Sequence, residues 1–150
     1  MSEITIRPAL PSEQRALEEL MRRASLANDG DREALLAHPE VIALPPEQLE
    51  DGLVFVAELG GEVAGFSALL NRDDGEIELD GLFTEPGRWR RGIGRALVEH
   101  SAAFARERGA TTMHVIANFE ARGFYERCGF VETGPYQTQF GPALRMEMSL

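Results

Sequence analysis

The chain has 150 residues, 43% of them hydrophobic and 27% charged, as in an ordinary globular protein, and this length fits one domain spanning residues 1–150. A single cysteine excludes an internal disulfide framework, and no apolar run approaches the roughly 20 residues of a membrane-spanning helix, so we expect a cytoplasmic protein with no membrane partner. The net charge of −10 disfavours nucleic acid as a partner, because phosphate contacts need a broad basic face.

The first half of the sequence predicts a strand, two helices and a β-hairpin. Gly60-Gly61 lies between two apolar runs, which is a strong hairpin signal. Pro39 ends the second helix, and a further helical turn follows Pro46. The expected elements are a strand at 4–7, a helix from 11 to about 28, a short helix at 31–38, and hairpin strands at 53–59 and 62–70.

The second half of the sequence alternates strands and helices. Apolar residues from Ile93 to Phe104 recur at helical spacing, and Gly109 marks the end of that helix. The expected elements are a strand at 77–83, helices at 92–108 and 120–127, and strands at 112–117, 130–132 and 144–149. The strand–helix–strand unit must be parallel and right-handed. The elements therefore indicate an α/β fold whose sheet is mostly antiparallel at its start.

Residues 85–97 join a strand to a helix through a turn that holds Gly92 and Gly94. The first N–H groups of a helix have no intrahelical partner, and the helix dipole adds partial positive charge there. Glycine lets an anion approach the bare backbone. The arginines that add charge around the turn are Arg88, Arg90, Arg91 and Arg95. The pattern therefore predicts a phosphate-binding site.

Two common nucleotide-binding motifs do not fit this turn. Leu97 occupies the place of the third glycine of the dinucleotide motif, and three strands precede the turn in hairpin order, where a Rossmann unit would start the domain. A Rossmann-type protein that prefers NAD is an alternative hypothesis, against which this order argues. The chain contains no lysine and therefore no P-loop, which excludes a P-loop kinase or ATPase.

Three segments carry a resemblance to a known family. They are Leu79–Pro86, Arg91–Leu97 and the Asn-x-x-Ala-x-x-Phe-Tyr-Glu-x-x-Gly-Phe pattern at Asn118–Phe130. Together they resemble the GNAT superfamily of acyl-CoA-dependent N-acetyltransferases, closely from about Glu76 to Glu132. The resemblance implies an α/β (α+β) fold, with a mixed, mostly antiparallel sheet of six or seven strands flanked by about four helices. It also implies transfer of an acetyl group from acetyl-CoA to a primary amine by direct attack in a ternary complex.

The resemblance assigns the acetyl-CoA site. Backbone N–H groups of the turn would hold the pyrophosphate, and the strand end would pair with the pantetheine arm and polarise the thioester carbonyl. These coenzyme-binding residues are Arg90, Arg91, Gly92, Ile93, Gly94 and Arg95 at the turn, and Leu82, Phe83 and Thr84 on the strand. Core packing is the other role for the side chains of Leu82 and Phe83. Trp89 stands where the family usually has Gln or Arg, but arginines flank it.

The resemblance also implies catalytic residues. Tyr125 is the candidate general acid, because a tyrosine beside the sulfur can return a proton to the leaving thiolate, and it also belongs to the coenzyme site. Its other role is that of an aromatic on an amphipathic helix. Asn118 is expected to cap that helix and to contact pantetheine. Glu78 is the candidate general base, with Asp80 next, since an amine attacks only when neutral. Simple solvation is the other explanation for both carboxylates.

The sequence gives no metal site and no nucleophilic cysteine. The histidines show no metal-like spacing with each other or with Cys128; they are His38, His100 and His114. Direct acyl transfer needs no covalent enzyme intermediate, so Cys128 is interpreted as inert packing.

The acceptor is the least defined part of the prediction. In the family, acceptor choice lies in segments that correspond here to Ser12–Asp51 and Gly134–Ala143, which carry no readable motif. Residues 1–87 hold 6 basic and 19 acidic side chains, which favours a cationic small molecule, a polyamine or a protein N-terminus, although solubility explains the acidity equally well. Dimers are common in this superfamily, so a homodimer is an expectation. The alternative function is a GNAT-like sensor that binds acyl-CoA without turnover.

Overall fold

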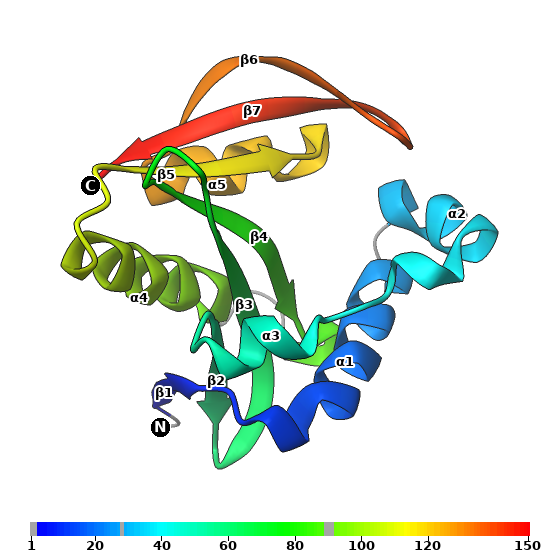
Figure 1. Cartoon of the computed structure of the whole chain (residues 1–150). Helices are drawn as coiled ribbons and strands as arrows, with labels where there is room; N and C mark the ends of the chain where they lie inside the picture. Colours follow the sequence, from blue (N-terminus) through cyan, green and yellow to red (C-terminus); the bar gives the residue numbers. More distant parts are fainter. Residues whose placement is uncertain (1–2, 28, 89–91) are drawn as a thin grey trace.

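The computed structural model describes residues 3–27, 29–88 and 92–150, which form one sheet and the helices around it (Figure 1). In chain order the elements are β1 (Ile4–Pro8), η1 (Pro11–Glu13), α1 (Gln14–Ala27), α2 (Asp29–Ala37), η2 (Pro39–Val41), α3 (Pro46–Glu50), β2 (Val54–Leu59), β3 (Glu62–Asn71), β4 (Ile77–Thr84), η3 (Pro86–Arg88), α4 (Ile93–Glu107), β5 (Thr112–Ala117), η4 (Phe119–Ala121), α5 (Arg122–Cys128), β6 (Val131–Thr138) and β7 (Gly141–Ser149). The η elements are single 3-10 turns.

The seven strands form one sheet in the order β1-β2-β3-β4-β5-β7-β6. Only β4 and β5 pair in parallel, and α4 connects them. All other neighbours are antiparallel, which confirms the predicted mixed, mostly antiparallel sheet. The described residues hold five α-helices, the additional one being α3, where the sequence indicated a further helical turn. Among the helices of these residues, none is both long enough and apolar enough to cross a membrane.

The parallel pair β4–β5 is short, and the two strands separate beyond it. Only three residue pairs join them, and Leu79–Val115 is the last. A bulge follows at once, because Leu79 pairs with Leu69 of β3 whereas Gly81 pairs with Ala68. Figure 1 shows β4 and β5 diverging from their shared start. From Gly81 onward, β4 therefore has paired backbone groups toward β3 and unpaired ones toward the opening.

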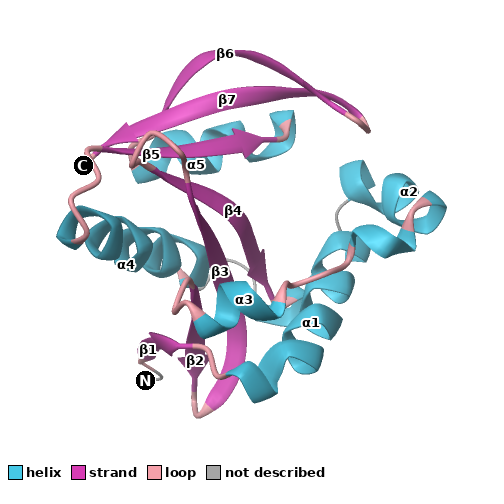
Figure 2. Cartoon of the chain, viewed as in Figure 1, coloured by secondary structure: helices cyan, strands magenta, loops and turns pink. Residues whose placement is uncertain are grey.

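Helices cover both faces of the sheet, as Figure 2 shows. On one face Leu97 and Val98 of α4 pack onto inward-facing residues of the strands. On the other face Leu17 and Leu20 of α1 pack with Phe66 of β3. The repeat of apolar residues every three or four positions in these helices explains why each buries one side.

Close packing against β3 holds the beginning of α4. A Cβ atom on Gly65 would lie 2.8 Å from the carbonyl oxygen of Phe83 and 3.0 Å from Cγ2 of Ile93, so only glycine fits between these elements. Farther along the helix, the buried hydroxyls of Ser67 and Ser101 hydrogen-bond at 2.9 Å. These contacts fix the first turn of α4 relative to the end of β4.

The C-terminal hairpin is longer than the sequence predicted. Strands were expected at 130–132 and 144–149, but β6 and β7 extend to a turn at residues 139–140, so residues 134–143 lie largely in strands. Pro135 and Pro142 obscured this, since proline disfavours strand interiors. Both positions tolerate it: β6 is an edge strand, and β7 pairs with β5 only from Leu144 onward.

Candidate active site

The turn before α4 has the backbone geometry of an anion site. Gly92 is the N-cap of the helix, with φ of 77°, in the left-handed region that favours glycine. It has no side chain that caps the helix, so the first N–H groups of α4 keep their hydrogen-bonding capacity. An anion placed there meets these N–H groups and the positive end of the helix dipole. Arg90, Arg91 and Trp89 lie outside the described residues.

A cavity of about 690 Å³, here called the turn cavity, lies beside this turn. Its walls come from β4, η3, the start of α4, η4 and α5, and the lining residues are Leu82, Thr84, Arg88, Gly92, Ile93, Gly94, Arg95, Glu120, Ala121, Phe124, Tyr125, Arg127 and Cys128. The structure therefore gathers most of the predicted coenzyme-binding residues around one space.

Two of the predicted coenzyme-site residues that the structure describes, Phe83 and Asn118, do not line the turn cavity. Phe83 packs against Phe66 with ring centroids 5.2 Å apart, which agrees with the core-packing role of its side chain and leaves only its backbone toward the opening. Asn118 caps η4, because its Oδ1 accepts a hydrogen bond of 2.8 Å from the N–H of Ala121, so the predicted cap is confirmed. Asn118 lines a different cavity.

Tyr125 lies on α5 and is 9% exposed. Its ring packs edge-on against Phe124 and Phe130, with centroids 5.2 and 5.4 Å away. Among the described residues no group hydrogen-bonds its hydroxyl, and the hydroxyl is not sealed from solvent. Burial, with a further contribution from Cys128, raises the pKa of Tyr125 above its usual value. The phenol is therefore protonated at neutral pH and can donate a proton.

Cys128 is a feature of the site that the sequence did not reveal. We interpreted it as inert packing, and its side chain does pack against the core, but it also lines the turn cavity. Burial raises the pKa of its thiol. Cysteine spacing carries no signal for such a position, because it depends on how α5 rotates toward the cavity. Cys128 shows how this environment acts on a thiol: it favours the neutral form.

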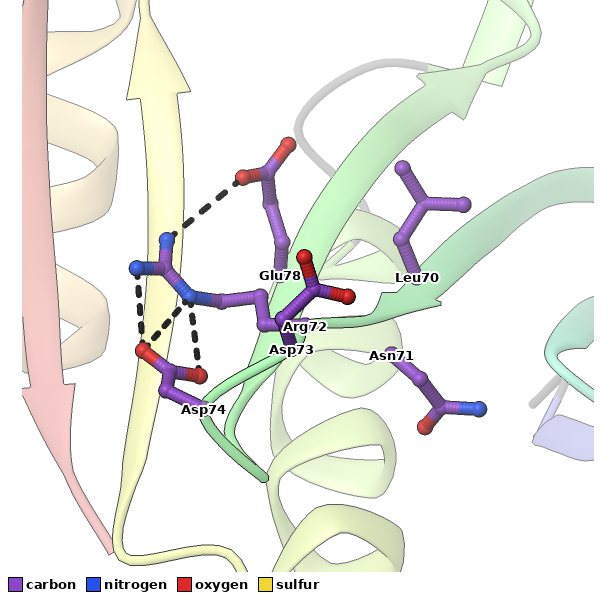
Figure 3. Close-up of a pocket in the computed structure, with 6 residues that line it drawn as sticks. All are labelled: Leu70, Asn71, Arg72, Asp73, Asp74 and Glu78. Atoms are coloured by element: carbon purple, nitrogen blue, oxygen red, sulfur yellow. Dashed lines mark hydrogen bonds and ion pairs between the residues drawn. The ribbon is translucent and has the colours of Figure 1, made fainter.

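Glu78 lies outside the turn cavity, in a shallow depression of about 440 Å³ at the β3–β4 turn. Figure 3 shows Arg72 between Asp74 and Glu78, with its guanidinium 3.8 Å from Oε1 of Glu78. Across the sheet Glu78 pairs with His114, which pairs with Glu147; His114 Nδ1 lies 3.3 Å from a Glu147 oxygen. Burial first, and then the charge of Asp80, raises the pKa of Glu78.

Asp80 occupies the bulge at the point where β4 leaves β5. Desolvation raises the pKa of the Asp80 carboxyl, while the nearby Gln48 side chain acts in the opposite direction. Gln48 is 4% exposed, and its Nε2 donates to the carbonyl of Leu69 at 2.8 Å. Its Oε1 has no partner among the described residues. The sequence did not point to Gln48, since one glutamine after two prolines carries no signal.

Another cavity, here called the hairpin cavity, has a volume of about 310 Å³ and lies at the end of β5. Its walls come from α2, from the end of β5 and from the β6–β7 hairpin, and the lining residues are Ala34, Ile116, Ala117, Asn118, Thr138, Phe140, Gly141, Pro142 and Ala143. Asn118 and Ala121 belong to the walls of the hairpin and turn cavities respectively, and a hydrogen bond joins them.

A family model described as the acetyltransferase (GNAT) family matches residues 15–130 of the sequence. The chain belongs to the GNAT acetyltransferase family. The match confirms the resemblance and makes the chain an acyltransferase enzyme of the N-acetyltransferase type. It also overrules the Rossmann alternative.

Individual N-acetyltransferases agree with this assignment. This chain is 27% identical to the 5-NmdU N-acetyltransferase of Pseudomonas phage PaMx11 over 134 aligned residues. The alignment covers 87% of this chain and 89% of the relative. The fold of this chain matches a GCN5-related N-acetyltransferase from Rhodopseudomonas palustris with a TM-score of 0.83 and 24% identity, covering 100% of this chain and 98% of the other. It also matches the PaiA N-acetyltransferase from Thermoplasma acidophilum, solved with coenzyme A, with a TM-score of 0.78 and 17% identity over 99% of each chain.

In the part of the chain that the structure describes, no three side chains of histidine, cysteine, aspartate or glutamate lie close enough together to bind a metal ion.

Proposed function

We propose that the enzyme transfers the acetyl group of acetyl-CoA to a primary amine by direct attack in a ternary complex, with residues 1–150 acting as one domain. The observation that carries the proposal is the turn cavity, whose lining includes residues of the Gly92 turn, of the unpaired end of β4 and of α5, among them Tyr125. A diphosphate, an extended amide chain and a thioester occur in this order in acetyl-CoA. The donor therefore matches the cavity in chemistry from end to end.

The phosphate end of the donor would bind at the turn. Backbone N–H groups at Gly92, Ile93, Gly94 and Arg95 would bind the phosphates. Arg90 and Arg91, which precede them in the sequence, would take part in the same site. Arg88 also lines the cavity and is paired with the exposed Glu62 at 2.9 Å. An exposed pair of this kind contributes little to stability, so Arg88 can exchange Glu62 for a phosphate at small cost.

The pantetheine arm would add to β4 as a short strand. Backbone groups of Leu82, Phe83 and Thr84 on the opening side have no partner in β5, because the pairing ends at Leu79. An extended amide chain satisfies such groups through main-chain hydrogen bonds. Asn118, which directly follows β5, would be a second contact of the pantetheine arm.

The chemical step follows from these positions. The amine nitrogen attacks the thioester carbonyl carbon, and a backbone N–H of the β4 end stabilises the oxyanion that forms. The C–S bond then breaks, and Tyr125 donates its proton to the sulfur, so that free coenzyme A leaves as a thiol. The proton that the amine loses goes to a carboxylate, and the phenolate regains a proton from solvent.

We assign the base role to Glu78, acting through water. Burial raises its pKa toward the range in which a carboxylate accepts protons efficiently near neutral pH. Asp80 is the second candidate, favoured by its place at the bulge where the opening begins. Activity measured for Glu78→Gln and Asp80→Asn as a function of pH separates them: the base variant loses the rise in rate with pH, and the other variant keeps it.

Isothermal titration with acetyl-CoA tests the donor, and free-thiol release across an amine panel tests the transfer. Saturable binding together with amine-dependent thiol release is the expected result. An absence of saturable binding at near-millimolar acetyl-CoA would contradict the proposal. Binding without thiol release from any amine, and without an effect of Tyr125→Phe, would instead favour the acyl-CoA sensor.

A further inference from the structure

The hairpin cavity lies where an acceptor must approach. Ala117 and Asn118 follow Val115, the last residue of β5 that pairs with β4, so the cavity borders the opening between these strands. The turn cavity borders the same opening through Leu82 of β4. A molecule in the hairpin cavity can therefore present a substituent toward a thioester held along β4.

No charged side chain lines the hairpin cavity among the described residues. Ile116, Phe140 and Pro142 supply apolar surface, and the Phe140 ring is 44% exposed and so available to a ligand. The ring also packs against His38, with centroids 5.3 Å apart, which brings the segment after α2 against the β6–β7 turn. The walls offer apolar and aromatic contact rather than ion pairing.

The polar side chains of this cavity are mostly occupied by the protein itself. The Thr138 hydroxyl donates to the Gly141 carbonyl at 2.8 Å and accepts from the Phe140 N–H at 3.1 Å. Asn118 uses its oxygen to cap η4, which leaves its amide N–H groups as side-chain donors. A ligand with several ammonium groups would leave them without carboxylate partners here, and burying unpaired charge is costly.

The carboxylates of Glu78, Glu147 and Asp80 lie along the sheet next to this cavity, and none of the three lines it. His114 is two residues before Ile116 on β5, on the same face, and it is flanked by Glu78 and Glu147. Asp80 stands at the edge of the opening. A single positive charge is therefore favoured at the opening, while the body of the molecule meets an uncharged wall.

Resting on the proposed acetyl transfer, we infer that the acceptor is a small primary amine whose body is uncharged and aromatic or apolar, bound in the hairpin cavity against Ile116 and Phe140. The volume of about 310 Å³ accommodates a body of ring size. This class replaces the polyamine and the protein N-terminus that the overall acidity favoured. Phe140 and Ala34 then determine specificity, because each contributes to a wall that touches the acceptor body.

Thiol release with saturating acetyl-CoA compares three amines: 2-phenylethylamine, spermidine and a short peptide with a free N-terminus. We expect kcat/KM for 2-phenylethylamine to exceed the other two at least about ten-fold, the ratio given by roughly one buried apolar group. Equal or better turnover of spermidine or of the peptide overturns the inference and leaves the proposed function intact. An absence of thiol release with all amines overturns both.

Two variants with matched controls locate the binding site. Ala34→Phe fills the cavity from α2, and Ala103→Phe makes the same change at an exposed position of α4. Phe140→Ser removes the aromatic wall, and Val131→Ser removes another exposed apolar side chain of the same hairpin. The cavity variants should raise KM for 2-phenylethylamine about ten-fold, with KM for acetyl-CoA unchanged. An unchanged amine KM, or an equal rise in the controls, refutes the assignment.

Discussion

Replacing Tyr125 by Phe removes one hydroxyl and leaves the packing of α5 in place. The ring contacts with Phe124 and Phe130 remain, and the lost hydroxyl has no hydrogen bond to the described residues, so the free energy of unfolding should change by less than about 1 kcal/mol. Binding of acetyl-CoA should be kept for the same reason. The proton donor, in contrast, is gone.

The expected loss in kcat is about 100-fold, at the low end of the usual range for general acid catalysis, and it corresponds to about 2.7 kcal/mol in the barrier. The low end is expected because burial raises the pKa of the Tyr125 phenol and makes it a weaker acid. The leaving thiolate becomes more basic in the same cavity, as the raised pKa of the Cys128 thiol indicates, so the phenol remains a useful donor.

The assay is free-thiol release under saturating acetyl-CoA, combined with calorimetric binding of acetyl-CoA and a thermal melt of both proteins. A variant that keeps more than half of the wild-type kcat would refute the acid role of Tyr125. A variant that loses acetyl-CoA binding and kcat together would show that the hydroxyl serves the donor site instead.

Three further substitutions test other parts of the structure. Gly92→Ala forces alanine into φ of 77°, which should cost about 1–2 kcal/mol in a denaturant titration and weaken acetyl-CoA binding; a variant with wild-type affinity argues against the turn as the phosphate site. Asp80→Asn removes a carboxyl whose pKa is raised in the folded state and whose ionised form therefore destabilises the fold. The melting temperature of the variant should exceed that of the wild type at pH 8, and the difference should vanish near pH 4. A difference that is the same at both pH values contradicts the raised pKa. Ser101→Ala leaves the Ser67 hydroxyl buried and unpaired and should lower the free energy of unfolding by about 1–3 kcal/mol. Adding Ser67→Ala to this variant should lower it by less than that. If the effects of the two substitutions simply add, the pairing is refuted.

Local signals predicted much of the fold, including the turn that we propose as the phosphate site of the donor. The Gly92 turn and α4 follow from glycine placement and from the helical repeat after Ile93, both of which act over a few residues. The Asn118 cap is likewise a local hydrogen bond, to the N–H of Ala121. The site roles of Tyr125 and Glu78, the cytoplasmic location and the homodimer stay predictions.

The features that the sequence did not predict depend on distant neighbours. Apolar and polar residues alternate through β4, so nothing in that pattern marks a bulge at Asp80. The bulge lies where β4 stops pairing with β5 while its pairing with β3 continues. The contact between His38 and Phe140 joins segments about a hundred positions apart in the sequence. No local sequence pattern indicates this contact, so the sequence did not predict the hairpin cavity. Gln48 lies near Asp80 because α3 packs against β3, where the Gln48 side chain donates to the carbonyl of Leu69.

The early end of pairing between β4 and β5 also bears on aggregation. Unpaired strand backbone is a template with which other protein chains can pair through main-chain hydrogen bonds, and proteins usually protect it. Here the exposed stretch faces a cavity of limited volume between α4 and α5, which admits a slender extended molecule more readily than a strand with side chains on both faces. The outer strands are protected differently: β1 ends in Pro8, and β6 carries Pro135. The enzyme can therefore keep an open stretch of strand without recruiting copies of itself.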